Sequence, residues 1–188
     1  MVLSERKYIM KRTKWLLVGC LLLSVALNLF LLADRWGENP KSIQFAELYK
    51  QSEENLRTSL YWFKEETRQD GQKQVYALYR AYQHMNEAVT KMKECMRELN
   101  RQGLDTESLE NSLAFIQNSM LDGLVNLAVG KEPELVLARD QLIYWTEYLP
   151  KEFPGGSERG KKTEELKKTM DTYKRNYLNP NGTIKLES

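Results

Sequence analysis

The sequence predicts an all-α protein, in which one N-terminal transmembrane helix is followed by an antiparallel four-helix bundle with a short fifth helix. Three observations predict this. An apolar run of 19 residues without a charge lies near the start of the chain. After it, apolar residues recur in steps of three and four along successive segments, as they do in amphipathic helices. Gly or Pro separates these segments, and no stretch has the apolar–polar alternation of a strand.

The apolar run extends from Trp15 to Ala33. As an α-helix it would span about 28 Å, close to the bilayer hydrocarbon thickness of about 30 Å. Trp15 and Trp36 bracket the run, and indole rings favour the two membrane interfaces. We therefore assign residues 15–36 to a transmembrane signal-anchor helix, which would place these residues in contact with the lipid bilayer.

The charges that flank this helix predict its orientation. Residues 5–14 carry five positive charges, whereas residues 34–43 carry two. Positive charges are retained in the cytoplasm, so residues 1–14 are expected to form a cytoplasmic basic segment. Residues 37–188 are then an extracytoplasmic domain, and the chain is a single-pass protein of the cell membrane.

Two alternatives to an uncleaved anchor remain. A signal peptidase could cleave after the small residues Ser24-Val25-Ala26, but the new N-terminus would then be strongly apolar. Leu17-Val18-Gly19-Cys20 resembles a lipoprotein cleavage box, but the apolar region before it is too short. The uncleaved anchor is the preferred interpretation.

Small and polar residues share one face of the predicted anchor. Cys20, Ser24 and Asn28 recur at intervals of four residues. Such a face allows membrane helices to approach closely, and an Asn side chain can donate a hydrogen bond across the interface for about 1 kcal/mol. The three residues are therefore candidates for membrane-helix association. The alternative is that Asn28 is simply tolerated in an otherwise apolar helix.

Four amphipathic segments follow the anchor. In the first, Asn39 suits an N-cap and Pro40 the first helical position, and the segment extends to about Asp70-Gly71. The second has one narrow apolar face typical of a long bundle or coiled-coil helix, and Gly103 ends it. That face consists of Val75, Leu78, Tyr82, Met85, Val89, Met92, Met96 and Leu99.

The third segment is expected to begin at Asp105 as its N-cap and to end at Gly130. The fourth runs from about Pro133 to Leu149. Residues 150–162 hold two Pro and three Gly residues and are predicted to form a mobile loop. A shorter helix is expected over about 163–178, followed by a frayed tail at 179–188.

Composition argues against several functions. The chain has 28 Lys and Arg and 26 Asp and Glu residues, of which 23 and 25 lie in residues 34–188. This near-neutral domain gives no electrostatic reason to expect nucleic acid as a partner. His84 is the only histidine, and Cys95 has no second Cys or His close by in sequence. No catalytic motif, metal-ligand spacing or phosphate-binding loop is present, so we expect neither an enzyme nor a cofactor.

Five aromatic residues cluster near the turn between the first two predicted helices. They are Tyr61, Trp62, Tyr76, Tyr79 and Tyr82. Tyr and Trp are favoured anchors in binding surfaces, so this cluster is a candidate ligand or partner surface. The alternative is ordinary packing in the core and at its boundary.

The sequence therefore favours a membrane-anchored helical interaction module outside the cytoplasmic membrane. It would be a non-enzymatic assembly or accessory factor that binds another membrane or envelope protein, or a copy of itself. The second interpretation is a small-molecule-binding bundle of the sensory type. A polar cavity between the first two helices would favour a small ligand, whereas a filled core with an exposed apolar face would favour a protein partner.

Overall fold

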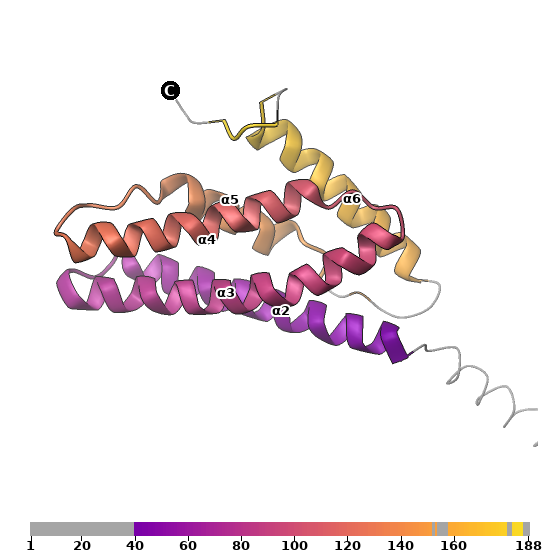
Figure 1. The fold of residues 1–188 in the computed structure, drawn as a ribbon, viewed down its shortest axis with the longest axis horizontal. Coiled ribbons are helices and arrows are strands. Elements are labelled where there is room, and N and C mark those ends of the chain that lie inside the picture. The colour runs from indigo at the N-terminus through magenta and orange to yellow at the C-terminus, as the bar shows by residue number, and fades with distance from the viewer. Residues whose placement is uncertain (1–39, 152, 154–157, 180–181, 186–188) are drawn as a thin grey trace, which may run out of the picture. The chain divides into compact units, whose positions relative to one another are not determined.

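The computed structural model describes residues 40–151, 153, 158–179 and 182–185. These residues form five α-helices and no strand, which confirms the all-helical class for this part of the chain. The helices form a bundle (Figure 1). In chain order they are α2 (Pro40–Glu66), α3 (Gly71–Arg101), α4 (Glu107–Ala128), α5 (Val136–Tyr148) and α6 (Glu158–Tyr177).

The predicted anchor belongs to a separate part of the chain. The molecule divides into two compact units, Met1–Pro40 and Lys41–Ser188, and the bundle lies in the second. Residues 15–36, with Cys20, Ser24 and Asn28 among them, lie outside the described residues, so the transmembrane helix remains a prediction. None of the described helices has both the length and the apolarity needed to cross a bilayer.

The contacts between α2 and α3 repeat every seven residues. Side chains join the two helices at four pairs of positions: Phe45 with Cys95, Ser52 with Ala88, Ser59 with Ala81, and Glu66 with Gln74. Each step of seven along α2 is matched by a step of seven backwards along α3. The two helices are therefore antiparallel and keep one register over their contact.

Small side chains set the spacing of α2 and α3. The hydroxyls of Ser52 and Ser59 donate hydrogen bonds of 2.8 Å to the backbone carbonyls of Ala88 and Ala81. All four residues are fully buried. A hydroxyl can reach the backbone of the opposite helix only where no large side chain separates the two, so the facing positions need small residues such as alanine.

The predicted apolar face of α3 is buried. Leu78, Met85, Val89, Met92, Met96 and Leu99 belong to the core. The remaining two members, Val75 and Tyr82, are half-buried near the start of the helix. The step-of-three-and-four pattern thus identified the side of α3 that faces its neighbours.

α4 packs against α3, α5 and α6, and Figure 1 shows it lying along α3. Gly123 marks a close approach on α4. A Cβ atom there would lie 3.0 Å from Leu135 and 3.1 Å from Leu78. The absence of a side chain at Gly123 thus lets α4 approach α3 and the segment that leads into α5.

Two helix starts differ from the prediction. α4 begins at Glu107 with Thr106 as N-cap, whereas Asp105 was expected to be the cap. The carboxylate of Asp105 accepts a hydrogen bond of 3.0 Å from the backbone N–H of Glu107, so it still satisfies a donor at this end of the helix. α5 begins at Val136, three residues after Pro133.

Described parts of the predicted loop at 150–162 contact the bundle or belong to α6. At its start, the hydroxyl of Tyr49 donates a hydrogen bond of 2.8 Å to the carbonyl of Pro150. The ring of Phe153 is buried, 4.7 Å from the ring of Tyr49 and 5.4 Å from that of Phe45. At its end, α6 already begins at Glu158 and includes Gly160, and most of the residues that follow in this helix are charged residues that favour helices.

The last helix is not short. α6 has 20 residues, against 13 in α5. In the tail, Leu178 and Ile184 form an isolated antiparallel bridge. The backbone N–H of Lys185 donates a hydrogen bond of 2.8 Å to the carbonyl of Tyr177. The described part of the tail therefore folds back onto the end of α6, where the sequence predicted fraying.

Candidate interaction surfaces

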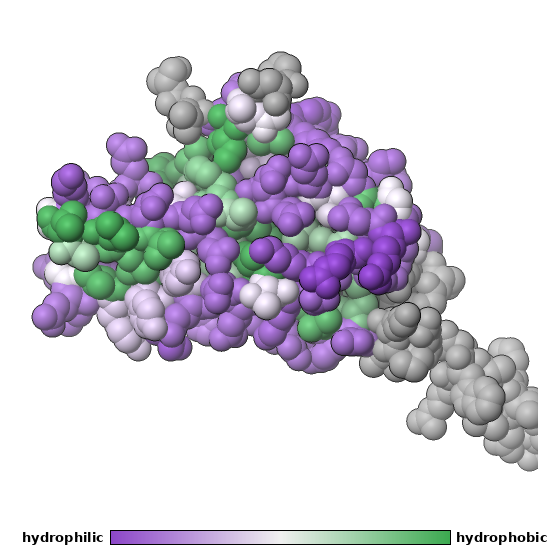
Figure 2. Space-filling view, viewed as in Figure 1, coloured by the Kyte–Doolittle hydropathy of each residue, from purple (hydrophilic) through white to green (hydrophobic). Residues whose placement is uncertain are grey.

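The C-terminal half of α4 is apolar on two sides. Met120, Leu124 and Leu127 face the core or pack against it. On the outer side, Leu121, Val125 and Val129 follow one another at intervals of four residues, and Val136 begins the next helix. These four side chains are between 45% and 67% exposed. Figure 2 shows a hydrophobic area at this end of the bundle, and we call these four residues the apolar patch.

Charged residues beside the apolar patch are mainly acidic. Asp122 follows Leu121 on α4, and Lys131, Glu132 and Glu134 lie in the connection between Val129 and Val136. All four are exposed, and none forms an ion pair within the described part of the chain. Three acids and one base therefore give the sequence neighbours of the patch a net negative charge.

Sequence reasoning missed the apolar patch. The apolar steps of three and four in this segment, which include Met120, Leu124 and Leu127, predict only the inner face of the helix. The signal was nevertheless present, because Leu121, Val125 and Val129 have the same helical spacing on another side. An amphipathic helix in a monomeric bundle needs only one apolar side, so a second apolar side is itself a signal of an exposed apolar surface.

The predicted aromatic cluster forms in part. The ring of Trp62 lies 5.4 Å from that of Tyr61 and 5.8 Å from that of Tyr76, both edge to face. Tyr61 and Tyr76 are more than half exposed, whereas Trp62 is half-buried. The guanidinium of Arg80 lies 5.7 Å from the Trp62 ring, a distance typical of a cation–π contact.

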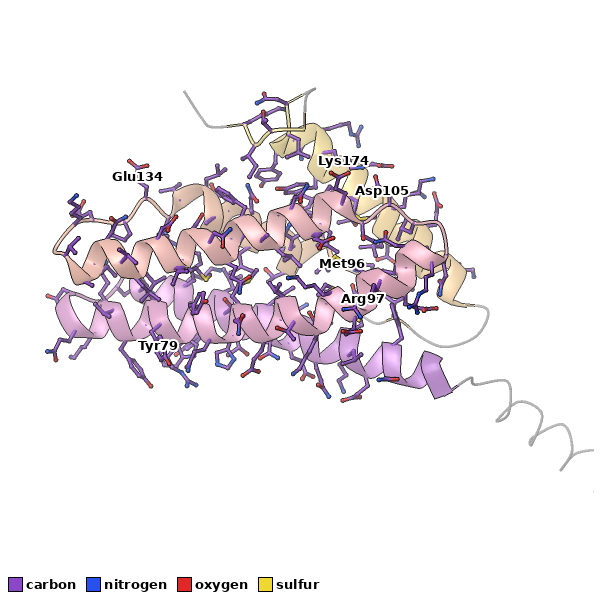
Figure 3. The ribbon with its side chains drawn as sticks, viewed as in Figure 1. Tyr79, Met96, Arg97, Asp105, Glu134 and Lys174 are labelled. Atoms are coloured by element: carbon purple, nitrogen blue, oxygen red, sulfur yellow. The ribbon has the colours of Figure 1, made fainter. Side chains whose placement is uncertain are left out.

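The other two members of the cluster have different environments. Tyr79 is 47% exposed, and its hydroxyl accepts a hydrogen bond of 2.9 Å from Gln83. Tyr82 packs against the core. Among the described residues, neither ring contacts Tyr61, Trp62 or Tyr76. Figure 3 shows Tyr79 on α3, on the other side of the bundle from Glu134 near the apolar patch.

A buried polar cluster joins α4, α5 and α6. The indole N–H of Trp145 donates to the hydroxyl of Ser112 at 2.7 Å. The hydroxyls of Ser112 and Tyr173 each donate to the side-chain oxygen of Gln141 at 2.8 Å. All four side chains are almost completely buried. The Gln141 amide nitrogen has no hydrogen-bond partner among the described residues, so the cluster is not fully satisfied.

The tyrosines around this cluster are neutral donors. Burial raises the pKa of Tyr173 to about 12. Burial also raises the pKa of Tyr144 to about 12, and the neighbouring Tyr177 and Tyr148 add to the effect. Each phenol is therefore neutral at pH 7 and acts as a hydrogen-bond donor. Tyr173 donates to Gln141, and Tyr144 donates to the carbonyl of Thr169 at 2.7 Å.

An ion pair joins α5 to the α2–α3 turn. The Arg139 guanidinium donates a hydrogen bond of 2.9 Å to Glu66 and lies 4.8 Å from the Phe63 ring. Glu66, 3% exposed, also accepts from Gln74 at 2.7 Å. These partners compensate a buried carboxylate, so we assign the group to structure. Among the described residues, no three His, Cys, Asp or Glu side chains gather closely enough to hold a metal ion.

Comparison with known proteins adds no relationship to this description. The sequence matches no protein-family model, and no curated protein and no solved structure is detectably similar to it. The function is therefore inferred from the surfaces described above.

Proposed function

We propose that the chain is a single-pass, membrane-anchored helical interaction module that acts outside the cytoplasmic membrane. In this proposal residues 15–36 form the transmembrane helix and residues 37–188 the extracytoplasmic bundle. The module is a non-enzymatic assembly or accessory factor, and it binds another membrane or envelope protein. The observation that supports this proposal is the apolar patch of Leu121, Val125, Val129 and Val136. Contiguous exposed apolar side chains on a folded domain commonly mark an interaction surface.

The packing of α2 against α3 also favours a protein partner over a small ligand between these helices. At Ser52 and Ser59 the two backbones are joined directly by side-chain hydrogen bonds. A ligand cannot enter between the helices there without breaking these bonds. A solvent-open pocket of about 200 Å³ lies between the start of α2 and the end of α3, beside Phe45 and Cys95, but it does not extend through this direct contact.

The charges beside the apolar patch define the partner's chemistry. A second copy would bring Asp122, Glu132 and Glu134 close to their own counterparts, and like charges at an interface are unfavourable. An anionic lipid surface would be repelled in the same way. The complementary partner is a protein segment with an apolar centre and Lys or Arg beside it. An amphipathic helix fits the i, i+4, i+8 row on α4, because helix faces pack through such rows.

Site-specific photo-crosslinking in native membranes tests this proposal. A photoreactive amino acid replaces Val125 in one variant and Tyr79 in a matched control, which is exposed on another side of the bundle. We expect adducts from position 125 with one membrane or envelope protein, in a segment that is apolar and flanked by basic residues. Val129→Asp in the first variant should abolish these adducts without changing the thermal stability of the bundle.

Other results would contradict the proposal. Adducts only between copies of this chain would show that the patch mediates self-association and not binding of another protein. Adducts only with lipid would assign the apolar patch to the bilayer. Equal adducts from positions 125 and 79, or no adducts from either, would show that the apolar patch is not a specific interaction surface.

The proposed orientation has a separate test. A Cys residue replaces Ser188, and Cys20→Ala removes the thiol of the predicted anchor. Cys95 is buried, so it contributes little background. A membrane-impermeant thiol reagent should label Ser188→Cys on intact cells, and labelling only after lysis would reverse the topology. The same cells can test Asn28→Leu, which should weaken pairing of anchor helices if Cys20, Ser24 and Asn28 form a contact face.

A further inference from the structure

A second surface feature lies between α5 and α6, apart from the apolar patch. It is a solvent-open groove of about 890 Å³, which is within the size range of small-molecule sites. One wall is a face of α5 and the other is the C-terminal part of α6. The helix residues that line it are Leu137, Asp140, Ile143, Tyr144, Glu147, Tyr148, Thr172, Asn176 and Tyr177.

Three tyrosine rings form the middle of this groove. The ring of Tyr144 lies 4.8 Å from that of Tyr148 and 5.5 Å from that of Tyr177. The hydroxyl of Tyr144 donates to the carbonyl of Thr169, which fixes the orientation of the ring. The faces of aromatic rings carry negative electrostatic potential and attract organic cations.

Two carboxylates lie on the α5 wall on either side of Tyr144. Asp140 and Glu147 are exposed and line the groove. Neither has an ion-pair or hydrogen-bond partner within the described part of the chain. They are seven residues apart in one helix, so about 10 Å separates them along its axis. Ile143 lies between them and is half-buried, whereas Tyr144 is only 6% exposed and the ring of Tyr148, which is 57% exposed, provides most of the accessible aromatic surface.

One cation also borders the groove. Lys185, in the tail that follows α6, contributes to the lining. Its ammonium donates a hydrogen bond of 2.7 Å to the backbone carbonyl of Arg175. That bond holds it at the α6 side, so Asp140 and Glu147 on α5 remain without a counter-ion. The groove therefore combines two unpaired negative charges with an aromatic and aliphatic floor.

We propose that this groove binds a linear polyamine. One ammonium group contacts Asp140 and another contacts Glu147, and the methylene chain between them lies over Ile143, beside the exposed Tyr148 ring. Two ammonium groups joined by a flexible apolar chain match this arrangement of charge, apolar surface and charge. A compact monovalent cation would satisfy only one carboxylate, and an anion would be repelled by both.

Equilibrium dialysis of the full chain in a non-ionic detergent, with radiolabelled spermidine as the probe, tests the proposal. We expect saturable binding of one spermidine per chain, weakened by added salt. Asp140→Asn and Glu147→Gln should each lower the affinity on the order of fivefold, the effect of one contact charge pair in water. Tyr148→Leu should lower it less, and Lys185→Gln should raise it by removing a competing cation.

The controls separate a built groove from general attraction to acidic residues. Glu87→Gln and Glu164→Gln remove exposed carboxylates outside the groove and should leave the affinity unchanged. 1,8-Diaminooctane should compete with spermidine, whereas 1-aminooctane should compete several-fold less well. Loss of binding in the groove variants alone supports the proposal. Equal loss in the control variants, equal competition by the monoamine, or no saturable binding would overturn it.

This test is independent of the proposed protein partner. Asp140, Glu147 and Tyr148 are not members of the apolar patch, so a failed dialysis experiment leaves the crosslinking result unaffected. Conversely, a failed crosslinking experiment at the apolar patch would not affect the proposal that the groove binds a polyamine.

Discussion

The contact between α2 and α3 and the contact among α4, α5 and α6 are built by different means. Between α2 and α3, contacts repeat every seven positions, and at the two central pairs a single serine hydroxyl reaches the backbone carbonyl of an alanine. Among α4, α5 and α6, large aromatic rings surround a polar cluster in which Gln141 accepts two hydrogen bonds through one oxygen. We therefore call the contact between α2 and α3 the regular contact, and the contact among α4, α5 and α6 the irregular contact.

This difference affects how each contact tolerates change. The carbonyls of Ala81 and Ala88 lie within α3, where helical carbonyls already accept a backbone hydrogen bond. Loss of a serine hydroxyl therefore leaves no orphaned group. In the other contact, loss of Gln141 would orphan the hydroxyls of Ser112 and Tyr173 together. The apolar patch and the α5–α6 groove both lie on the helices of the irregular contact.

The largest effect is expected for Trp145→Ala. Trp145 is the largest fully buried side chain, and its indole N–H is bonded to Ser112. Replacement by alanine should lower the free energy of unfolding by about 3–5 kcal/mol. Chemical denaturation of a fragment spanning residues 41–188, the second compact unit, measures this change. Trp62→Ala, at a half-buried position on α2, is the control and should lower the free energy of unfolding clearly less. Equal losses of free energy in the two variants would contradict the assignment of the core.

Overpacking should reveal the close spacing of α2 and α3. Ala88→Leu places a large side chain opposite Ser52, where the helices are in direct contact. We expect a loss of about 1–3 kcal/mol in the free energy of unfolding of the same fragment, because the helices must separate. Ala128→Leu, at the exposed end of α4, should change it little. An unchanged unfolding midpoint for Ala88→Leu would mean that α2 and α3 are further apart than described.

Gln141→Leu should show that the polar cluster acts as a unit. The substitution leaves two buried hydroxyls without their acceptor, which we expect to cost about 1–3 kcal/mol. The double variant that also carries Tyr173→Phe removes one of those donors and should regain part of the loss, while Ser112 is kept because it also accepts from the Trp145 indole. Additive losses across the two substitutions in denaturation experiments would show that the groups are independent.

The irregular contact should also weaken in alkali. A tyrosine has a pKa of about 10 in an unfolded chain, whereas the pKa values of Tyr144 and Tyr173 are both about 12 in the folded protein. Above pH 10 the unfolded chain loses these protons first. Stability is therefore complete below pH 10 and is lost as the pH rises towards 12. Thermal unfolding from pH 9 to 11.5 measures the loss, and Tyr173→Phe should reduce its slope.

The regular contact was the easier one to predict, but only in its apolar part. The face of α3 from Leu78 to Leu99 follows directly from helical periodicity. Ser52 and Ser59 are polar, so their burial could not be read from a hydrophobic pattern; it depends on the alanines that face them from α3. Phe153 lies among Pro and Gly residues, and its burial depends on Phe45 and Tyr49, which are about a hundred positions away in the chain.

The aromatic cluster, the groove and the apolar patch also differ in how far the sequence predicts them. The contact of Trp62 with Tyr61 and Tyr76 follows from their positions near one turn, so sequence proximity predicted it. The α5–α6 groove brings Tyr144 and Tyr177 together across a connection whose path the sequence does not determine. The apolar patch could have been found, because its residues have helical spacing on α4. Its exposure depends on which side of α4 the other helices cover, and that is a property of the fold.

The smallest effect is expected for Ser52→Ala and Ser59→Ala, and it distinguishes the two contacts most sharply. Each substitution removes one neutral hydrogen bond, worth about 1 kcal/mol, and exposes no unsatisfied partner. The alanine also fits the space of the serine. We therefore expect each variant to lose about 1 kcal/mol or less in the free energy of unfolding, with the double variant close to the sum because the two sites are two turns apart. Denaturation of the fragment spanning residues 41–188, beside Gln141→Leu as the reference, measures both. A loss for Ser52→Ala as large as that for Gln141→Leu would mean that the α2–α3 contact also depends on shared hydrogen-bond partners, and the distinction between a regular and an irregular contact would fail.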